Sequence, residues 1–493
     1  MRNKLFILIN SKEIGNSFFN IFSIFSYFLA FLTIIVVKHP LLALISLLFN
    51  LFLAYTYKIK EFRILPGFIL LVVFNALYIQ IPIVYMCYKA DDYNFQAFIK
   101  LPNDNNFYLN SLTSGLLYFI LCYFFVLIGM LFGNIYKFKN IAISNLFTKK
   151  FTVKIWVLIG LLTFIFTWID NAKIFFARSS SSEKSENFLA LLFNDKTYSL
   201  VFPCLFYFLP SKNKDRNYIY FLIIFILFFL LNLSGTNKGA LLQMFTFFFL
   251  GPLSFFYCSN QVIFWPKKNI LIIGIIVAIP LFLFSMFSRS LMNLGVPLTI
   301  NNILDNLQKS DELNFTIFFE LIFYRLSVTL NNFILIFTTF SDNFSFDYSY
   351  HYFKYVTNSF LNLILPGTPF PESYVLTSQL LPQVLNKQSI YSELDKISLL
   401  QQANTQPYSL FGVFFILFSK YLVLIPCFIF GFLFTLSYNI LKRPSLKIII
   451  MSFFGIFLQS YGIEAAMQFL VLTIVTEYFL YKILFFFDRL NYH

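Results

Sequence analysis

The sequence predicts an all-α fold, a polytopic membrane helix bundle of about 12 transmembrane helices with a large outer-face loop region that contains short or re-entrant helices. Three observations predict it. Of the 493 residues, 59% are hydrophobic and only 12% are charged, whereas about a quarter of the residues of a soluble domain are charged. Long apolar stretches recur along the chain, and the basic residues gather in alternate connecting segments.

The expected spans follow from length. A membrane-spanning helix needs about 20 mostly apolar residues, because the hydrocarbon core is about 30 Å thick and a helix rises about 1.5 Å per residue. The candidate stretches are 18–37, 40–57, 65–87, 114–136, 151–169, 188–209, 218–233, 239–257, 269–287, 420–440, 447–461 and 467–486. Basic residues precede the first stretch as in a signal peptide, but no small-residue cleavage site follows. We therefore expect a retained anchor.

The basic residues predict the orientation. More than half of the 36 Lys and Arg residues lie in the N-terminus, 58–64, 137–154, 210–217, 258–268, 441–447 and the C-terminus. These segments contain few acidic residues, which are Glu13, Glu61, Asp215 and Asp488. Because basic loops stay in the cytoplasm, we expect these segments and both termini on that side. The formal charge of +14 therefore marks an orientation, and we expect no nucleic-acid partner.

The chain divides into three expected regions. Residues 1–287 form a membrane domain with nine spans, 288–406 a large loop region on the outer face, and 407–493 a C-terminal membrane domain with three spans. Within the loop region, 315–340 is apolar but contains Glu320 and Arg325. A single crossing there would move the basic segment 441–447 to the outer side, so we expect a re-entrant or interfacial helix. The alternative pairs a crossing with a return near 351–365, which gives fourteen spans.

Four cations lie beside expected outer span ends. They are Arg178 in FFARSSSSEKSENF, Lys238 in LSGTNKGALL, Arg289 in MFSRSLMN and Arg325 in ELIFYRLSVTLNN. A cation at such depth is costly unless it is paired or lines a wet cavity. Guanidinium groups bind phosphate oxygens in a bidentate way, so the four could surround a lipid pyrophosphate. The alternative is that they are snorkelling anchors or structural ion pairs.

Several residues could serve as a base that deprotonates a sugar hydroxyl. The candidates are His351, Glu320, Glu372 and Glu393, and their distance from the substrate would decide between them. His351 lies in DYSYHYFKY, where it is equally compatible with an interfacial aromatic belt. The polar stretch 366–410 is rich in Tyr, Gln, Asn, Ser and Thr. Such side chains suit carbohydrate, although a plain extracytoplasmic loop has a similar composition.

The sequence offers little sign of a metal or cofactor. The five cysteines form no CxxC pair and lie in or beside apolar stretches, and the three histidines are scattered. Asp91 and Asp92 could hold a divalent metal over a diphosphate, or they form a solvated loop pair. We therefore expect neither a metal nor a cofactor.

The chain resembles a known family. The resemblance lies in the turn GTNKGALL after a span, the basic residue in FSRS, the segment FYRLSVTLNN, TQPYSLFG before a late span, and the overall plan of spans and loops. These features are similar to the oligosaccharide repeat-unit polymerases of bacterial surface polysaccharides, the O-antigen polymerase (Wzy) type. The resemblance implies an enzyme of the bacterial inner membrane. On the periplasmic side it would join undecaprenyl-pyrophosphate-linked repeat units, with a polysaccharide chain-length regulator as a possible partner.

The resemblance also implies residue roles. The expected catalytic residues are Arg289, Arg325, Glu320 and His351, and the expected substrate-binding residues are Arg178, Lys238, Asn237 and Tyr324. The cations would neutralise charge on the departing diphosphate. Lys238 stands where arginine would be a stronger bidentate clamp.

Two alternatives remain. One is an O-antigen ligase or another lipid-phosphosugar glycosyltransferase, which would use the same leaving group. The other is a lipid-linked oligosaccharide flippase or another transporter, for which ionisable groups at mid-membrane are typical. The clear acid inside a predicted span is Glu477.

Overall fold

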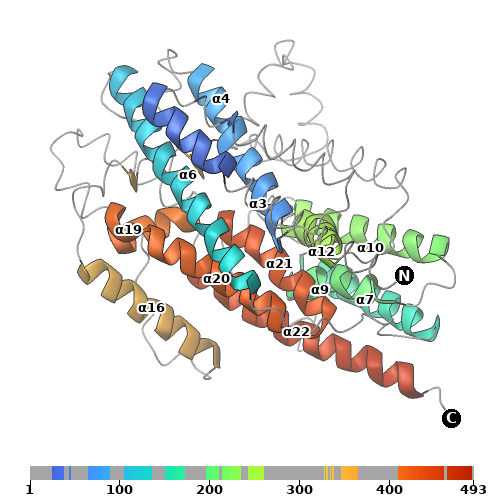
Figure 1. Ribbon diagram of the computed structural model, residues 1–493. Coiled ribbons are helices and arrows are strands. Elements are labelled where there is room, and N and C mark those ends of the chain that lie inside the picture. The colour runs from blue at the N-terminus through green and yellow to red at the C-terminus, as the bar shows by residue number, and fades with distance from the viewer. Residues whose placement is uncertain are drawn as a thin grey trace, which may run out of the picture.

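The computed structural model confirms the all-α expectation for the residues that it describes (Figure 1). These are residues 25–37, 41, 44–45, 65–88, 105–135, 150–171, 196–209, 214–234, 243–259, 327, 329–330, 333–334, 336–337, 346–364, 409–459 and 463–490. Every regular element within these ranges is a helix. The predicted span at 269–287 lies outside them, as does almost all of the span at 40–57.

The helices are as follows. A helix at 25–37 precedes α3 (Phe68–Asn75), η2 (Ala76–Gln80), α4 (Ile81–Tyr88), α6 (Asn105–Ile135), α7 (Lys150–Asn171), α9 (Lys196–Phe206), α10 (Lys214–Ser234), η4 (Thr246–Leu250), α12 (Gly251–Ser259), α16 (Phe346–Ile364), α19 (Leu410–Leu422), α20 (Leu424–Ile440), α21 (Pro444–Gln459) and α22 (Ile463–Leu490). The labels η2 and η4 mark single π-turns that continue their neighbouring α-helices.

Three described helices are long and apolar enough to cross a membrane, by length and composition. They are Phe68–Cys87, Asn110–Ile135 and Phe469–Leu490. Shorter apolar helices lie at Phe25–Val37, Thr152–Phe166, Tyr218–Phe229, Gln243–Phe256, Leu410–Leu422, Leu424–Ile440 and Pro444–Leu458. The chain is therefore a membrane protein, and the total of about 12 spans stays a prediction.

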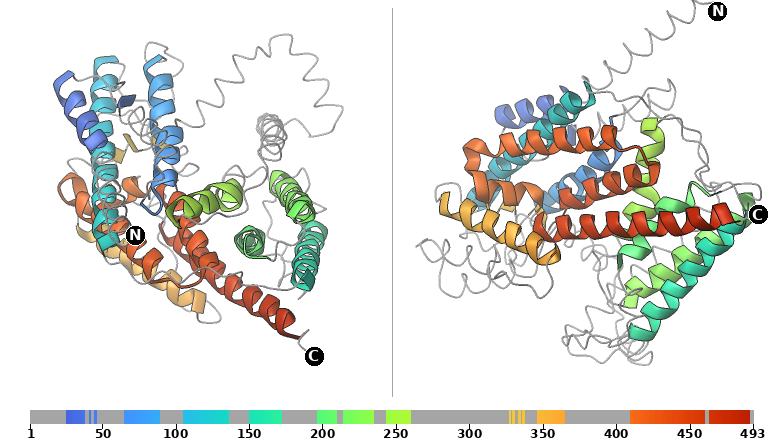
Figure 2. Two further views of the ribbon diagram at one scale, coloured as in Figure 1. Left: turned by 45° about the vertical axis from the view of Figure 1, so that its right-hand side comes forward. Right: turned by 90° about the horizontal axis from the view of Figure 1, so that it is seen from below.

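The C-terminal helices connect two groups of helices (Figure 2). On one side, α20 packs along α6 and α21 packs against α3. On the other side, α22 packs against α7 and α9, and α12 also contacts α21. Within the described part of the chain, α20, α21 and α22 thus hold the two groups together, although the sequence divides the chain into an N-terminal and a C-terminal membrane region.

The most extensive contact between two helices joins α6 and α20. It depends on glycine. A Cβ atom built on Gly129 would lie 2.1 Å from the carbonyl oxygen of Phe428, and one on Gly431 would lie 2.1 Å from that of Val126. Gly133, one turn after Gly129, would meet the carbonyl oxygen of Phe432 at 2.7 Å. Small residues at this spacing let membrane helices approach closely and gain dispersion energy.

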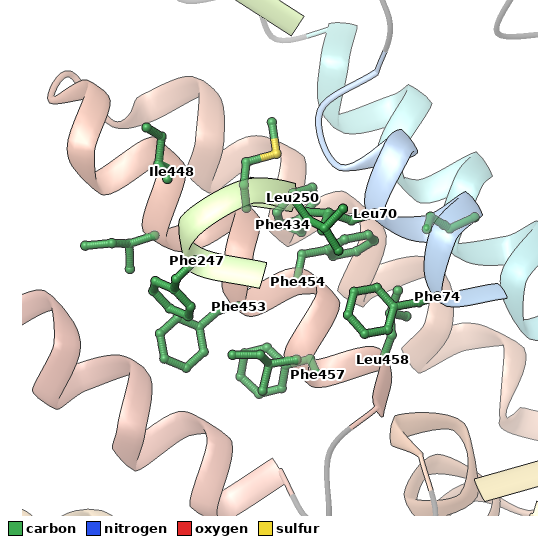
Figure 3. Close-up of a cluster of buried hydrophobic side chains, with 14 of the residues drawn as sticks. Leu70, Phe74, Phe247, Leu250, Phe434, Ile448, Phe453, Phe454, Phe457 and Leu458 are labelled. Carbon is green, nitrogen blue, oxygen red and sulfur yellow. The ribbon is translucent and has the colours of Figure 1, made fainter. Parts of the chain in front are cut away.

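Phenylalanine fills the space where the groups meet (Figure 3). Phe434 of α20 stacks on Phe454 of α21, with ring centroids 4.1 Å apart, and Phe247 of η4 packs on Phe453 with centroids 5.4 Å apart. Gly67 begins α3 at φ 78°, and a Cβ atom there would lie 2.8 Å from the Phe434 ring. The turn before α3 therefore needs glycine for both its backbone conformation and its packing.

Two hydrogen bonds between polar side chains and neighbouring helices orient α7 inside the bundle. The indole N–H of Trp156 on α7 donates to the Phe202 carbonyl of α9 at 3.2 Å. The Thr152 hydroxyl donates to the Asp488 carboxylate of α22 at 2.7 Å. Because unpaired polar groups are costly in an apolar medium, these bonds fix how α7 faces α9 and α22.

We predict that Gly129→Ala and Gly431→Ala each destabilise the protein, by about 1–3 kcal/mol. The added methyl group would press on backbone atoms that cannot move without separating α6 from α20. The measurement is the thermal unfolding midpoint of the detergent-solubilised chain. The matched control is Gly115→Ala, which shares the gain in helix propensity but meets a movable side-chain atom, Ile334 Cγ1, at 3.1 Å. Equal midpoints for all three variants would contradict the close-packing argument.

Candidate functional site

Most predicted site residues lie outside the described part of the chain. These are Arg178, Asn237, Lys238, Arg289, Glu320, Tyr324 and Arg325, together with Asp91, Asp92, Glu372 and Glu393. The predicted convergence of the four cations on one vestibule therefore remains a prediction. His351 is described, and it lies on α16.

The first two turns of α16 present aromatic and basic side chains at the surface. Tyr350 is 64% exposed and Phe353 is 52% exposed, and His351 and Lys354 are exposed beside them. The rings of Tyr350 and His351 meet edge to face, with centroids 5.6 Å apart. Tyr352, which lies between His351 and Phe353 in the sequence, is buried. Such a surface combines rings that can stack on a sugar, an imidazole that can accept a proton and an ammonium group that can contact phosphate.

A break in α19 positions this surface. Ser409 caps the start of α19 by accepting the Gly412 amide at 3.4 Å, and the helix then runs to Ser419, whose φ is 60° and ψ is 174°. Beyond the break, the Tyr421 amide donates to the Ser419 hydroxyl at 3.4 Å. In a continuous helix that amide would bond to the Leu417 carbonyl. The carbonyl instead accepts the hydroxyl of Ser349 from α16.

The break therefore has a structural consequence. A non-glycine residue at positive φ costs about 1–3 kcal/mol, and it persists where surrounding contacts hold it in place. Here the Ser349 hydroxyl and the contact of Phe353 with Phe418, at 6.3 Å between centroids, join α16 to the broken turn. Lys420 and the 77%-exposed Tyr421 follow the break directly. The α16–α19 junction thus brings together two segments that each carry a lysine and an exposed tyrosine.

This junction is not apparent from the sequence. The sequence predicts a tenth span that begins at about residue 420, whereas the structure begins a helix at Leu410, breaks it at Ser419 and continues as α20 from Leu424. The polar pair Ser419–Lys420 inside an otherwise apolar stretch was the available signal. Near the predicted return at 351–365 the structure has α16, which is not among the helices apolar enough to cross a membrane.

The described part of the predicted helix 315–340 packs beside the same junction. Its described residues, 327, 329–330, 333–334 and 336–337, are helical, and all of them except Phe337 are buried. Phe333 meets Phe119 of α6 with centroids 4.6 Å apart and Phe415 of α19 at 6.2 Å. Phe337 packs on Tyr118 at 5.1 Å. These described residues therefore join α6 to α19. The expectation that 315–340 is a re-entrant or interfacial helix stays a prediction.

The buried acid Glu477 is paired where it lies. One carboxylate oxygen is 3.1 Å from a guanidinium nitrogen of Arg443, and the other accepts the hydroxyl of Ser445 at the start of α21. The Arg443 guanidinium also lies over the rings of Tyr478 and Tyr481, at 5.3 and 5.1 Å from their centroids. A buried carboxylate with such partners joins α21 to α22, and this arrangement is typical of a structural ion pair.

Comparison with known proteins finds no matching family model, no matching curated protein and no matching solved structure. Within the described ranges, no group of three or more His, Cys, Asp or Glu residues is placed to hold a metal ion.

We predict that Ser349→Ala loosens α16 from the α19 break. The Leu417 carbonyl would lose the hydrogen bond that it accepts from the Ser349 hydroxyl. Losing such a bond typically costs a buried group about 1–3 kcal/mol. Amide hydrogen exchange should quicken in 346–364 while it stays unchanged in α6. Thr357→Ala is the matched control, because the Thr357 hydroxyl bonds only to the Phe353 carbonyl of its own helix among the bonds described, at 2.8 Å. Unchanged exchange in Ser349→Ala would contradict the proposed attachment.

Proposed function

We propose that this protein is a polymerase that joins undecaprenyl-pyrophosphate-linked oligosaccharide repeat units on the periplasmic face of the bacterial inner membrane, in O-antigen or capsule biosynthesis. The enzyme is a metal-independent glycosyltransferase in this proposal. The observation that carries it is the α16–α19 junction, where exposed Tyr350, His351 and Lys354 lie on a helix attached to apolar helices. A lipid-linked sugar has the complementary parts, which are a sugar ring, a diphosphate and a hydrocarbon tail.

The predicted orientation supports placing this surface on the periplasmic side. The large loop region 288–406, which contains α16, follows an odd number of predicted spans after a cytoplasmic N-terminus. The amphipathic character of α16 suits a helix that lies along the membrane boundary. Glu320, Tyr324 and Arg325 precede the buried Phe333, which packs on Phe415 of α19. This proximity in sequence supports a common site for these residues and the junction.

The chemistry is a glycosyl transfer with diphosphate as leaving group. A hydroxyl oxygen of the new repeat unit attacks the anomeric carbon of the growing chain, and the bond from that carbon to the lipid diphosphate breaks. The hydroxyl proton passes to a base, for which we propose Glu320 or His351. Negative charge grows on the departing diphosphate, and Arg289 and Arg325 would stabilise it, with Arg178 and Lys238 holding the substrate.

The structure weakens the support for a transporter. That alternative used Glu477 as an ionisable group available within the membrane. Glu477 is instead paired with Arg443 and Ser445 in the described structure. Moving a proton or ion through this group would require breaking a buried pair, which is costly.

Deletion of the gene in its host should leave a lipid core capped by a single repeat unit, because units would still be made and exported but not joined. A gel of surface polysaccharide measures this. A ligase or a flippase mutant should leave no repeat unit on the core, so that result would reject the polymerase. As a control, the wild-type gene on a plasmid should restore the ladder, which excludes an effect of the deletion on neighbouring genes.

Arg289→Ala and Arg325→Ala should each abolish chain extension, because neutralising the departing diphosphate is worth factors of about 10²–10³ in rate. His351→Gln and Lys354→Gln should shorten the chains. Polysaccharide ladders and membrane protein levels are the measurements. Lys309→Ala removes a cation from the same loop region and is expected to keep the normal ladder. Normal ladders in both arginine variants would remove the site assignment.

A further inference from the structure

A second group of cations lies at the turn between α20 and α21. Lys442 and Arg443 form this turn, Lys447 follows on the first turns of α21, and Lys482 faces them from α22. The rings of Tyr438, Tyr478 and Tyr481 lie between them. We refer to these seven residues as the basic–aromatic cluster. It uses none of the residues assigned to glycosyl transfer.

Aromatic rings contact three cations of this cluster, Arg443, Lys447 and Lys482. Tyr478 contacts two cations, with the Arg443 guanidinium carbon 5.3 Å and the Lys482 Nζ 5.4 Å from its ring centroid. The Lys447 Nζ lies 4.7 Å from the centroid of Tyr438 on α20. Cation–π contacts at these distances contribute about 0.5–1 kcal/mol each at exposed sites. The cluster therefore combines cations from the α20–α21 turn, α21 and α22 with aromatic rings from α20 and α22.

The cluster has more positive than negative charge. Glu477 offsets Arg443 through the ion pair at 3.1 Å. Within the described part of the chain, no carboxylate forms an ion pair with Lys442, Lys447 or Lys482. Lys442 and Lys482 are exposed. The cluster thus contains two exposed ammonium groups and a third that is partly buried, and this excess of positive charge favours an anion at this position.

The α20–α21 turn places the cluster near the membrane boundary, because it connects two apolar helices, Leu424–Ile440 and Pro444–Leu458, and irregular backbone is avoided within the hydrocarbon core. The neighbouring helix α22 has 28 residues, so it is about 42 Å long at 1.5 Å per residue, whereas the hydrocarbon core is about 30 Å thick. Its C-terminal end runs past the α20–α21 turn (Figure 1). The charged side chains Lys482, Asp488 and Arg489 all lie in that end. Tyr478 of the cluster and the adjacent Phe479 are 52% and 49% exposed, as expected for residues at the level of lipid headgroups.

We propose that the basic–aromatic cluster is a binding site for the headgroup phosphate of an anionic phospholipid, with phosphatidylglycerol as the test ligand. Lys442 and Lys482 contact the phosphate, and the exposed rings of Tyr478 and Phe479 lie along the acyl chains. The exposed rings distinguish a lipid from free phosphate, because a soluble anion gains nothing from apolar surface. Arg443 acts as a positioning residue, since its pair with Glu477 fixes α21 against α22.

The experiment measures the thermal unfolding midpoint of the purified full chain in neutral detergent, titrated with phosphatidylglycerol, phosphatidylcholine or inorganic phosphate. A ligand that binds only the folded state raises the midpoint. Phosphatidylglycerol should raise it at concentrations where the other two do not. Lys442→Gln with Lys482→Gln should weaken the apparent affinity for phosphatidylglycerol on the order of tenfold or more, since each basic residue contributes measurably to anionic lipid binding.

Matched variants separate a site from diffuse attraction. Lys154→Gln removes an exposed cation from α7 and should leave the phosphatidylglycerol response unchanged. Lys442→Arg with Lys482→Arg keeps the charge and should restore the response, which also shows that the positions tolerate substitution. An equal effect of phosphatidylcholine or of inorganic phosphate, or an equal loss in Lys154→Gln, would overturn the proposal. These results are independent of polysaccharide synthesis.

Discussion

The backbone contact between α6 and α20 is the constraint on which the rest of the arrangement depends. Gly129 and Gly431 allow the two helices to touch at a separation that any Cβ atom would prevent. In a membrane no hydrophobic effect drives helices together, so such contact relies on dispersion over a large fitted surface. With α20 fixed on α6, α21 reaches α3 and α12, and α22 reaches α7 and α9. One glycine-mediated contact therefore connects segments 300 residues apart in sequence.

The two buried carboxylates of the described structure each have a partner. Glu477 forms an ion pair with Arg443 through one oxygen and accepts a hydrogen bond from the Ser445 hydroxyl through the other. Asp488 accepts the hydroxyl of Thr152 from a distant helix. Phenylalanine contacts alone would allow several alignments of neighbouring helices. These bonds favour one alignment, because a shift of α22 would leave a carboxylate unpaired in an apolar medium.

The break at Ser419 connects this architecture to the proposed chemistry. In a continuous helix from 410 to 440, the Tyr421 amide would bond to the Leu417 carbonyl, and α16 would meet only side chains. The break makes the Leu417 carbonyl available to Ser349, and so attaches an aromatic and basic helix to the bundle. The proposed lipid site at the α20–α21 turn has a different composition, with cations held by rings and an arginine–glutamate pair beneath them.

The sequence by itself determined the all-helical class, the membrane character and the location of most apolar helices, because hydropathy and length depend only on residues near one another in the chain. It also identified Glu477 as an unusual acid. The partner of Glu477, the glycine contact of α6 with α20 and the break at Ser419 were decided by the tertiary structure. Each depends on a residue from another helix, and a phenylalanine-rich sequence has little periodicity to indicate which face meets which neighbour. The Ser349 bond likewise exists only because folding brings α16 to a carbonyl that α19 leaves without its helical donor.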